Sequence, residues 1–269
     1  MTVGSGSPGV ANEPVPRAAG ALAIRVVSYN VHGLGDDRRA LNAVVRTLAP
    51  DVVVVQEAPR RFRWRARCAE LAHSWGMIYA SGGLPSLGNL IVVSQRIRVR
   101  KAWSLQYPLT PGRHMRGAAF AHCTVAGAAF TVAGSHLATD DAERVGQAQR
   151  LKDEIGGIQS SVILAGDFNE TAAGASWKLL AAGLVDVGAE ADQPTFAATE
   201  PKRRIDGIFV TPDIAVRSCQ VLTGDATRAA SDHLPLIADL EVPVFPASPK
   251  PARVRNLSSS VIWDVPEMT

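Results

Sequence analysis

The sequence predicts a single α/β domain. Short apolar runs rich in β-branched residues alternate along the chain with segments whose apolar residues recur at helical spacing, a pattern typical of strands and helices that share one core. The chain has 269 residues, 46% of them hydrophobic, which is long enough to bury one sizeable core. No internal repeat or interdomain linker is evident. We expect the domain at residues 22–242, between a disordered leader at residues 1–21 and a tail at residues 243–269.

The first part of the chain alternates strand and helix. Residues 24–29 form an apolar run that ends at the polar Asn30, as a buried strand entering a loop does. Helical spacing follows in residues 40–48, after two aspartates that favour a helix N-terminus, and Pro50 stops the helix. Residues 51–56 include four consecutive valines and predict a strand buried on both faces. A second helix, with arginines on its other side, is indicated by Trp64, Cys68, Leu71, Ala72 and Trp75.

The rest of the chain is richer in strands. Antiparallel strands joined by Gly and Pro turns are predicted at residues 90–93, 99–105, 118–125 and 130–135. A third helix begins at Asp140 and Asp141, and its apolar face is predicted to consist of Ala142, Val145, Ala148, Leu151 and Ile155. The remaining predicted elements are a strand at residues 162–165, a helix at residues 175–181, and strands at residues 208–210, 216–222 and 236–240.

Composition argues against several classes of protein. A formal net charge of +3 with 20% charged residues does not by itself announce nucleic-acid binding. Cys68, Cys123 and Cys219 are widely spaced and form no CxxC pair, so a zinc or disulfide framework is not expected. No apolar run reaches the roughly 20 residues that span a bilayer, and residues 1–20 lack the pattern of a secretory signal. We therefore expect a soluble, cytoplasmic monomer without a transmembrane segment.

Polar residues follow four of the predicted buried strands. Asn30, Glu57, His136 and Asp167 each stand directly after a strand or one residue past it, and ligands usually bind at strand ends in α/β sheets. Taken singly, each has a plain structural interpretation: a loop cap, a helix start, a hydrogen-bonded histidine and a turn. A charged Glu57 after four valines is nevertheless costly unless it is paired, solvated or bound to a metal. Their joint occurrence at strand ends favours one functional site.

Six short motifs extend this pattern along the chain. They are Ser28-Tyr29-Asn30-Val31-His32-Gly33, Val55-Gln56-Glu57, Gly134-Ser135-His136-Leu137, Gly166-Asp167-Phe168-Asn169, Arg204-Ile205-Asp206-Gly207-Ile208-Phe209 and Ser231-Asp232-His233-Leu234-Pro235. In this order, over residues 24–240, they resemble the endonuclease/exonuclease/phosphatase superfamily, whose fold includes DNase I. The resemblance implies a four-layer α/β sandwich, in which two mixed sheets pack face to face with helices outside, and a site at one edge.

The resemblance also implies a divalent cofactor, Mg²⁺ or Mn²⁺. The chemistry of the residues agrees, because carboxylate, amide and imidazole without a thiolate suit a hard ion. Glu57 would hold the metal, Asn30 would contact the metal or the phosphate, and Asp232 would be a second carboxylate on the metal side.

Phosphate-ester hydrolysis further requires a group that activates water and a group that assists the leaving oxygen. Asp167 would orient or deprotonate the water, and Asn169 would hydrogen-bond the water or a phosphate oxygen. Asp206 would orient His233, which would contact the phosphoryl group or act as the base; the choice of base between Asp167 and His233 stays open. His136 is a candidate general acid or phosphate donor.

The substrate is less constrained by the sequence. His136 stands where AP endonucleases of the superfamily have a Tyr-containing motif, and Ser135-His136-Leu137-Ala138-Thr139 instead resembles the DNase I, sphingomyelinase and phosphatase branches. Arg116 and Arg144 are candidate phosphate contacts, with a solvated arginine as the alternative. The arginines at positions 60, 61, 63, 65 and 67 could bind a phosphate backbone or an anionic head group, or form a solvated helix face.

Three functions are compatible with these residues. The first is a metal-dependent phosphodiesterase, with a nuclease acting on nucleic acid as one possibility. The second is a phosphomonoesterase or phospholipid phosphodiesterase that uses the same site. The third, a non-catalytic binding module, is disfavoured because every motif position is filled.

Overall fold

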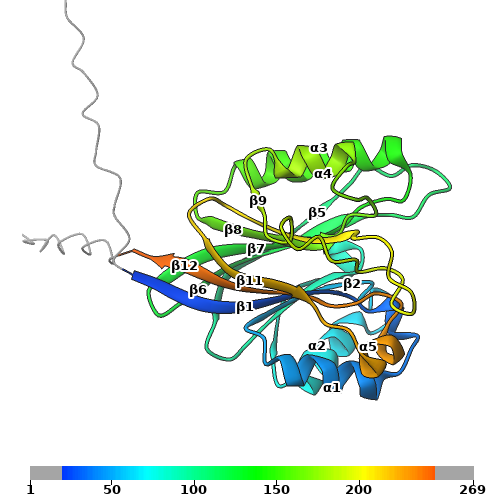
Figure 1. Cartoon of the computed structure of the whole chain (residues 1–269), viewed down its shortest axis with the longest axis horizontal. Coiled ribbons are helices and arrows are strands. Elements are labelled where there is room, and N and C mark those ends of the chain that lie inside the picture. The colour runs from blue at the N-terminus through cyan, green and yellow to red at the C-terminus, as the bar shows by residue number, and fades with distance from the viewer. Residues whose placement is uncertain (1–19, 246–269) are drawn as a thin grey trace, which may run out of the picture.

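The structure is a computed structural model that describes residues 20–245 (Figure 1). Its strands form two mixed sheets. The first has the order β3–β4–β2–β1–β12–β11 and comprises β1 (Gly20–Asn30), β2 (Val52–Gln56), β3 (Ile78–Gly83), β4 (Asn89–Val93), β11 (Ala215–Val221) and β12 (Leu236–Val244). The second has the order β5–β6–β7–β8–β10–β9 and comprises β5 (Arg98–Gln106), β6 (Gly117–Val125), β7 (Ala128–His136), β8 (Ser161–Asp167), β9 (Val185–Asp186) and β10 (Asp206–Val210).

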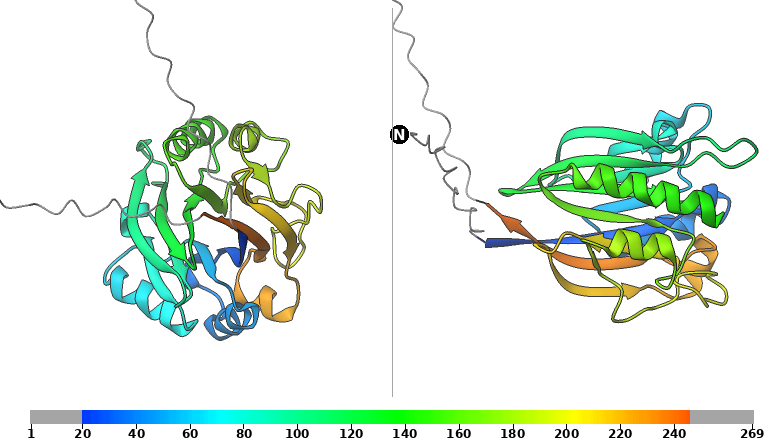
Figure 2. Two further views of the ribbon diagram at one scale, coloured as in Figure 1. Left: turned by 90° about the vertical axis from the view of Figure 1, so that its left-hand side faces the viewer. Right: turned by 90° about the horizontal axis from the view of Figure 1, so that it is seen from above.

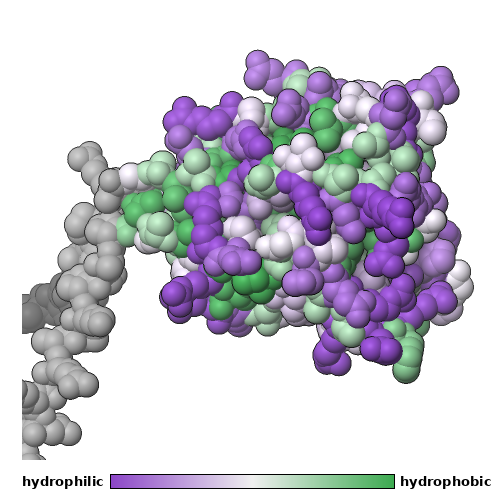
Figure 3. Space-filling model, turned by 90° about the horizontal axis from the view of Figure 1, so that it is seen from below, coloured by the Kyte–Doolittle hydropathy of each residue, from purple (hydrophilic) through white to green (hydrophobic). Residues whose placement is uncertain are grey.

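Helices cover the outer face of each sheet. The first sheet carries α1 (Arg38–Leu48), α2 (Trp64–Ser74) and α5 (Asp225–Ala230), and the second carries α3 (Asp141–Gly156) and α4 (Ala175–Ala181), as Figures 1 and 2 show. Two short 3₁₀ turns, His32–Leu34 and Leu84–Ser86, lie in the connections. Together these elements form the predicted four-layer α/β sandwich. Seen from the side of α1 and α2, hydrophilic residues alternate with small apolar patches (Figure 3), as on the solvent-facing side of an outer layer.

The valine-rich strand β2 shows how the layers are held together. Val52 and Val54 belong to the apolar core between the two sheets, whereas Val53 and Val55 belong to the core under α1 and α2. This alternation confirms the prediction of a strand buried on both faces, because successive side chains of a strand point to opposite sides. The sheets approach closely at Gly134, where an added Cβ would lie 2.6 Å from Val54 Cγ1.

Parallel pairs bring the polar strand ends to one edge of the sandwich. β1 runs parallel to β2 in the first sheet, and β7 runs parallel to β8 in the second. The other strand pairings are all antiparallel, as predicted for β5, β6 and β7, and a single residue pair, Val244 with Ala128, links the two sheets. Because all four parallel strands end at the same edge, the residues that follow them can form one site.

Helix α3 begins at the predicted place and buries the last three residues of its predicted apolar face, but its first turns present a different face inward. Asp140 caps it by accepting a hydrogen bond from the Glu143 amide at 3.1 Å. Val145, predicted to be in the core, is 39% exposed, and Arg144 is buried instead. The prediction for Val145 is therefore wrong, as is the alternative of a solvated Arg144. The reason is that the polar head of Arg144 finds partners under the helix, which apolar periodicity alone does not reveal.

The ends of the sandwich lie close to the expected domain bounds. β1 begins at Gly20 and β12 ends at Val244, two residues beyond residues 22–242 on each side. The rest of the expected leader and tail lies outside the described residues. Between residues 20 and 245, no helix has the length and apolar character needed to cross a membrane. Cys68, Cys123 and Cys219 are unpaired, and the first two are buried.

Candidate active site

Asp167 is the centre at which both sheets meet. Asn30 Nδ2, at the end of β1, donates to Asp167 Oδ2 at 3.0 Å, and the Asn169 amide donates to Asp167 Oδ1 at 2.9 Å. His136 Nε2, at the end of β7, lies 3.3 Å from Asp167 Oδ2. The carboxylate is 1% exposed. Asn30 and His136, two strand-end residues far apart in the sequence, thus meet around the buried Asp167 carboxylate together with Asn169, which follows it by two residues.

Asp206 and His233 form a hydrogen-bonded pair beside Asp167. Asp206 begins β10 and lies directly opposite Asp167 in the antiparallel register with β8. His233 Nδ1 is 2.9 Å from Asp206 Oδ2, and His233 Nε2 is 3.7 Å from Asp167 Oδ2. The ring of Phe196 packs against His233 with the ring centroids 4.8 Å apart. The pairing leaves Nε2 directed at the centre of the site, as expected for an imidazole oriented by a carboxylate.

The carboxylates around His233 keep it protonated. Burial acts to lower the pKa of His233, but the charge and hydrogen bond of Asp206, together with Asp167, outweigh burial and raise this pKa to about 9. Below that pH the imidazole carries both protons, so Nε2 can donate a hydrogen bond to an anion. A protonated His233 suits contact with a phosphoryl oxygen better than the role of base.

His136, unlike His233, is held in its neutral state. Burial, aided by the Arg116 guanidinium, lowers the pKa of His136 to about 3 although Asp167 opposes the shift. Arg116 Nη1 lies 3.3 Å from His136 Nδ1, and Asn169 Nδ2 lies 3.0 Å from His136 Nε2. Since arginine can only donate, Nδ1 is the acceptor and the ring is neutral near pH 7. Of the two predicted roles, this favours a hydrogen-bonding contact over a general acid.

The pKa of Asp167 is raised, first because burial disfavours its charged form and also because Asp206 lies nearby; His136 and His233 oppose the shift. A carboxylate with a raised pKa binds a proton more readily, which is what a general base requires. The two hydrogen bonds from Asn30 and Asn169 fix its orientation.

Glu57 and Asp232 lie on a more open side of the site, and the charges of both reach His32. His32 Nδ1 is 2.8 Å from Asp36 Oδ2 and 3.9 Å from Asp232 Oδ1. The hydrogen bond that Asp36 accepts from His32 raises the pKa of His32, burial opposes this, and the charges of Asp232 and Glu57 add to the rise. Both carboxylates therefore act on the same imidazole.

His32 and Asp36 were not among the predicted site residues. His32 stands inside the first motif, which was the available signal, but Asp36 was interpreted only as part of a helix start. Glu57 and His32 also share an unusual backbone, with φ of 57° and 45°. Such left-handed conformations are uncommon outside glycine and often occur at functional sites.

Two sets of side chains have the chemistry to hold a metal ion. Asp167, Asp206 and His233 have ligand atoms within 4.8 Å of one another, but the hydrogen bond to Asp206 already uses Nδ1 of His233. The other set is the predicted one, Glu57 and Asp232 with Asn30. Within residues 20–245, the Glu57 carboxylate has no hydrogen bond or ion pair. Carboxylate oxygens together with the amide oxygen of Asn30 are the donor types that a hard divalent cation prefers.

The two predicted phosphate-binding arginines differ in their surroundings. Arg116 lies beside His136, and its Nε atom, like that of Arg144, is buried without a hydrogen-bond partner among the described residues. Arg144 is 4% exposed; its Nη1 donates to the carbonyls of Ala138 at 3.0 Å and Thr139 at 2.9 Å. Its guanidinium also pairs with Asp141, and Nε lies 3.5 Å from Glu170 Oε1.

These contacts disfavour the predicted phosphate contact of Arg144, which stays a prediction. All the contacts of its guanidinium are internal, and they tie the loop after β7 to the loop after β8. Glu170 in turn accepts a hydrogen bond from the Trp177 amide at 2.9 Å at the start of α4. Arg144 thus holds the loops that carry His136 and Asn169.

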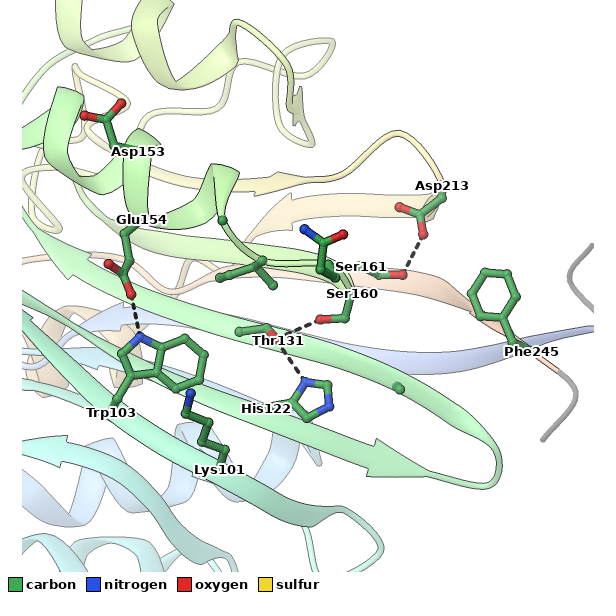
Figure 4. Close-up of a pocket in the computed structure, with 14 residues that line it drawn as sticks. Lys101, Trp103, His122, Thr131, Asp153, Glu154, Ser160, Ser161, Asp213 and Phe245 are labelled. Carbon is green, nitrogen blue, oxygen red and sulfur yellow. Dashed lines mark hydrogen bonds between the residues drawn. The ribbon is translucent and has the colours of Figure 1, made fainter. Parts of the chain in front are cut away.

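A cavity of about 870 Å³ is lined by residues other than those of the predicted site. Its polar side chains largely bind one another: Trp103 Nε1 donates to Glu154 at 2.8 Å, and Thr131 Oγ1 bonds both His122 at 3.1 Å and Ser160 at 2.9 Å (Figure 4). It contains none of the motif residues. By its volume alone this cavity would be the candidate ligand site. The polar groups that converge around Asp167 make that edge of the sandwich the candidate active site instead.

The fold and this arrangement are those of a phosphoesterase, and comparison with known proteins gives the family. Residues 27–233 match the model of the Endonuclease/Exonuclease/phosphatase family, so the chain belongs to that family. Its members are hydrolases that act on phosphoester bonds. A search of curated proteins returned no match.

Solved structures agree on the fold. An endonuclease/exonuclease/phosphatase from Bacteroides vulgatus is similar with a TM-score of 0.67 and 18% identity, over 82% of this chain and 99% of that chain. A mannosyl-6-phosphatase from Bacteroides thetaiotaomicron has a TM-score of 0.67 and 20% identity, over 81% and 99%. D. rerio TDP2 complexed with single-strand DNA product has a TM-score of 0.67 and 21% identity, over 81% and 98%. At these identities the likeness shows the fold alone.

Proposed function

We propose that the chain is a divalent-metal-dependent phosphodiesterase. The observation that carries this proposal is the buried Asp167 carboxylate, which lies between a neutral His136 and a protonated His233 and is oriented by Asn30 and Asn169. A base, a cationic donor and a neutral hydrogen-bonding group then surround the position of one phosphate. Such an arrangement supplies what water attack on a phosphodiester requires.

Each of these groups has a definite task in the proposed reaction. Asp167 takes a proton from the attacking water at Oδ1 or Oδ2, helped by its raised pKa. His233 donates from Nε2 to a phosphoryl oxygen, and Asp206 fixes its tautomer through Nδ1. The charged Arg116, which neutral His136 holds in place through Nδ1, binds a second phosphoryl oxygen. The positive charges act where negative charge develops in the transition state.

Glu57 and Asp232, with Asn30, would hold Mg²⁺ or Mn²⁺ on the open side of the site. When bound, the ion neutralises charge on the phosphoryl oxygens and helps to orient the substrate.

The test is hydrolysis of bis-p-nitrophenyl phosphate. We expect the wild-type chain to hydrolyse it with Mg²⁺ or Mn²⁺ and not in EDTA, and we expect Glu57→Ala to lose most of this activity. Asp153→Ala, which removes an exposed carboxylate of α3 that lines the 870 Å³ cavity, is the matched control and should retain it. Equal inertness of the wild type and Glu57→Ala across several metals would contradict the proposal.

Hydrolysis of a phosphomonoester is the second candidate. Arg116 adds a cation beside His136, and a monoester carries an extra negative charge that such a cation would stabilise. One protein of similar fold is a mannosyl-6-phosphatase. Comparing p-nitrophenyl phosphate with the bis-ester separates the two activities, and assays on plasmid DNA and RNA then test whether the diester is a nucleic acid.

A further inference from the structure

A second pocket opens directly beside the site. It has a volume of about 390 Å³, and Glu57 and His136 form part of its wall. Its other charged or titratable lining residues are Arg60, Arg61, Arg67, Arg116 and His114. Glu57 is thus the single acidic residue that lines it. The volume lies in the range of pockets that hold small ligands.

The arginines of this pocket differ in how they are held. Arg60 Nη1 donates to the carbonyl oxygen of Leu87 at 3.1 Å and lies 3.4 Å from that of Met115, which fixes it between two loops. Arg61 and Arg67, by contrast, form no side-chain hydrogen bond or ion pair with any residue between positions 20 and 245. Two guanidinium groups with uncompensated charge therefore line a pocket that reaches the site.

The structure divides the arginine cluster of the sequence into two groups. Arg60, Arg61 and Arg67 line the pocket, whereas Arg63 and Arg65 do not. The Arg65 guanidinium lies over the half-buried Trp64 ring, 4.4 Å from its centroid, and Arg63 and Arg65 are exposed. The solvated-face interpretation therefore fits Arg63 and Arg65, and the anion-binding interpretation fits the other three.

We propose that this pocket is a subsite for a second phosphate group of the substrate, next to the phosphate at Asp167; this rests on the proposed function. Guanidinium groups bind phosphate through paired, charge-assisted hydrogen bonds, and Arg61 and Arg67 have these donors free. The pocket continues from His136 and Glu57, so one molecule can occupy both positions. The substrate class is a phosphate ester that carries a further phosphate, on a nucleotide or on a phosphorylated polyol.

Direct binding tests this proposal without turnover. Calorimetry on the full-length chain in EDTA would compare thymidine 3′,5′-bisphosphate with thymidine 5′-monophosphate. We expect the bisphosphate to bind at least about tenfold more tightly, the size of a charged hydrogen-bonded contact. In the double variant Arg61→Ala/Arg67→Ala this ratio should fall to about 1–2. The double variant Arg63→Ala/Arg65→Ala removes the same charge from the same segment and should keep the ratio.

A second pair of ligands identifies the carrier of the phosphate. Inositol 1,4-bisphosphate and inositol 1-phosphate repeat the comparison on a polyol. If the bisphosphate binds more tightly in both pairs, the subsite recognises the second phosphate whatever molecule carries it. If it binds more tightly in one pair alone, the subsite is supported and that pair shows whether the substrate is a nucleotide or a phosphorylated polyol. A ratio of bisphosphate to monophosphate affinity near 1 for the wild type in both pairs overturns the proposal. An equal fall of this ratio in the two double variants also overturns it.

The outcome is separate from that of the proposed function. A chain that hydrolyses no ester but shows the arginine-dependent preference would contradict the phosphodiesterase and keep the subsite. A chain that hydrolyses the bis-ester but shows no preference for the bisphosphate would support the phosphodiesterase and contradict the subsite. Thermal unfolding of both double variants confirms that they are folded before the ratios are compared.

Discussion

The candidate site has two sides that differ in their access to water. The buried side consists of Asp167, Asp206, His136 and His233, none more than 5% exposed. The open side consists of Glu57, His32 and Asp232, and the side chains of His32 and Asp232 are 51% and 41% exposed. Hydrogen bonds link every residue of the buried side to another site residue, whereas the Glu57 carboxylate has no such partner among residues 20–245.

This difference indicates a division of labour. Charges act more strongly in a dry environment, and there the same fold raises the pKa of one histidine and lowers that of the other. A Mg²⁺ ion, by contrast, usually keeps several waters and binds one or two carboxylates, which suits the open side. We therefore expect proton transfer to depend on the buried side and metal binding on the open side.

Asp167→Asn is the strongest test of this division between proton transfer and metal binding. The substitution keeps the shape of the side chain and removes the base, so kcat should fall about 10²–10⁴-fold. The Mg²⁺ concentration for half-maximal activity should change little. A metal titration of the bis-p-nitrophenyl phosphate assay measures both quantities, and a large shift in the Mg²⁺ requirement would show that Asp167 belongs to the metal side.

Glu57→Gln is the complementary change on the open side. Loss of one carboxylate ligand should raise the Mg²⁺ concentration for half-maximal activity about 10–100-fold, and saturating Mg²⁺ should restore much of kcat. Mn²⁺ binding followed by electron paramagnetic resonance gives the same comparison without turnover. If kcat stays low at saturating metal, Glu57 acts in the chemistry and the division fails.

The buried side was largely predictable from the sequence, because its residues stand at the ends of apolar strands or inside short motifs. Asp167 and His136 end β8 and β7, whose apolar runs mark both strands as buried. The fold class followed from the same motifs. Pairing and register could not be derived, since they depend on contacts between distant strands such as β1 with β12.

The open side and the supporting contacts were harder to foresee. The left-handed backbone of Glu57 and His32 leaves no trace in residue type, because glycine would be the usual choice there. Arg144 interrupts the apolar face of α3, and a periodic pattern cannot show that its head binds two carbonyls. Strand β3 was also missed, since it ends in Gly82 and Gly83, which are poor strand formers.

A smaller effect, on pH dependence, tests the electrostatics of the buried side. If His233 must be protonated to contact the phosphoryl oxygen, activity should fall as pH rises through its pKa of about 9. Asp206→Asn removes the carboxylate that raises this pKa, so the alkaline fall should move toward the ordinary value of 6.5. The kcat/KM profile between pH 5 and 10 measures the shift. An unchanged alkaline limb would show that another group controls it.

The smallest effect on chemistry is expected at Arg144, which belongs to neither side but holds two of the loops. Arg144→Met keeps the bulk of the side chain and leaves the carbonyls of Ala138 and Thr139 without their donor. The free energy of unfolding should fall by about 1–3 kcal/mol, measured by urea denaturation, while KM for the bis-ester changes less than twofold. Arg150→Met, at an exposed position of the same helix, is the control and should be nearly neutral. If instead Arg144→Met is as stable as the control and KM rises several-fold, Arg144 contacts the phosphate after all, and its internal bonds must exchange with the substrate.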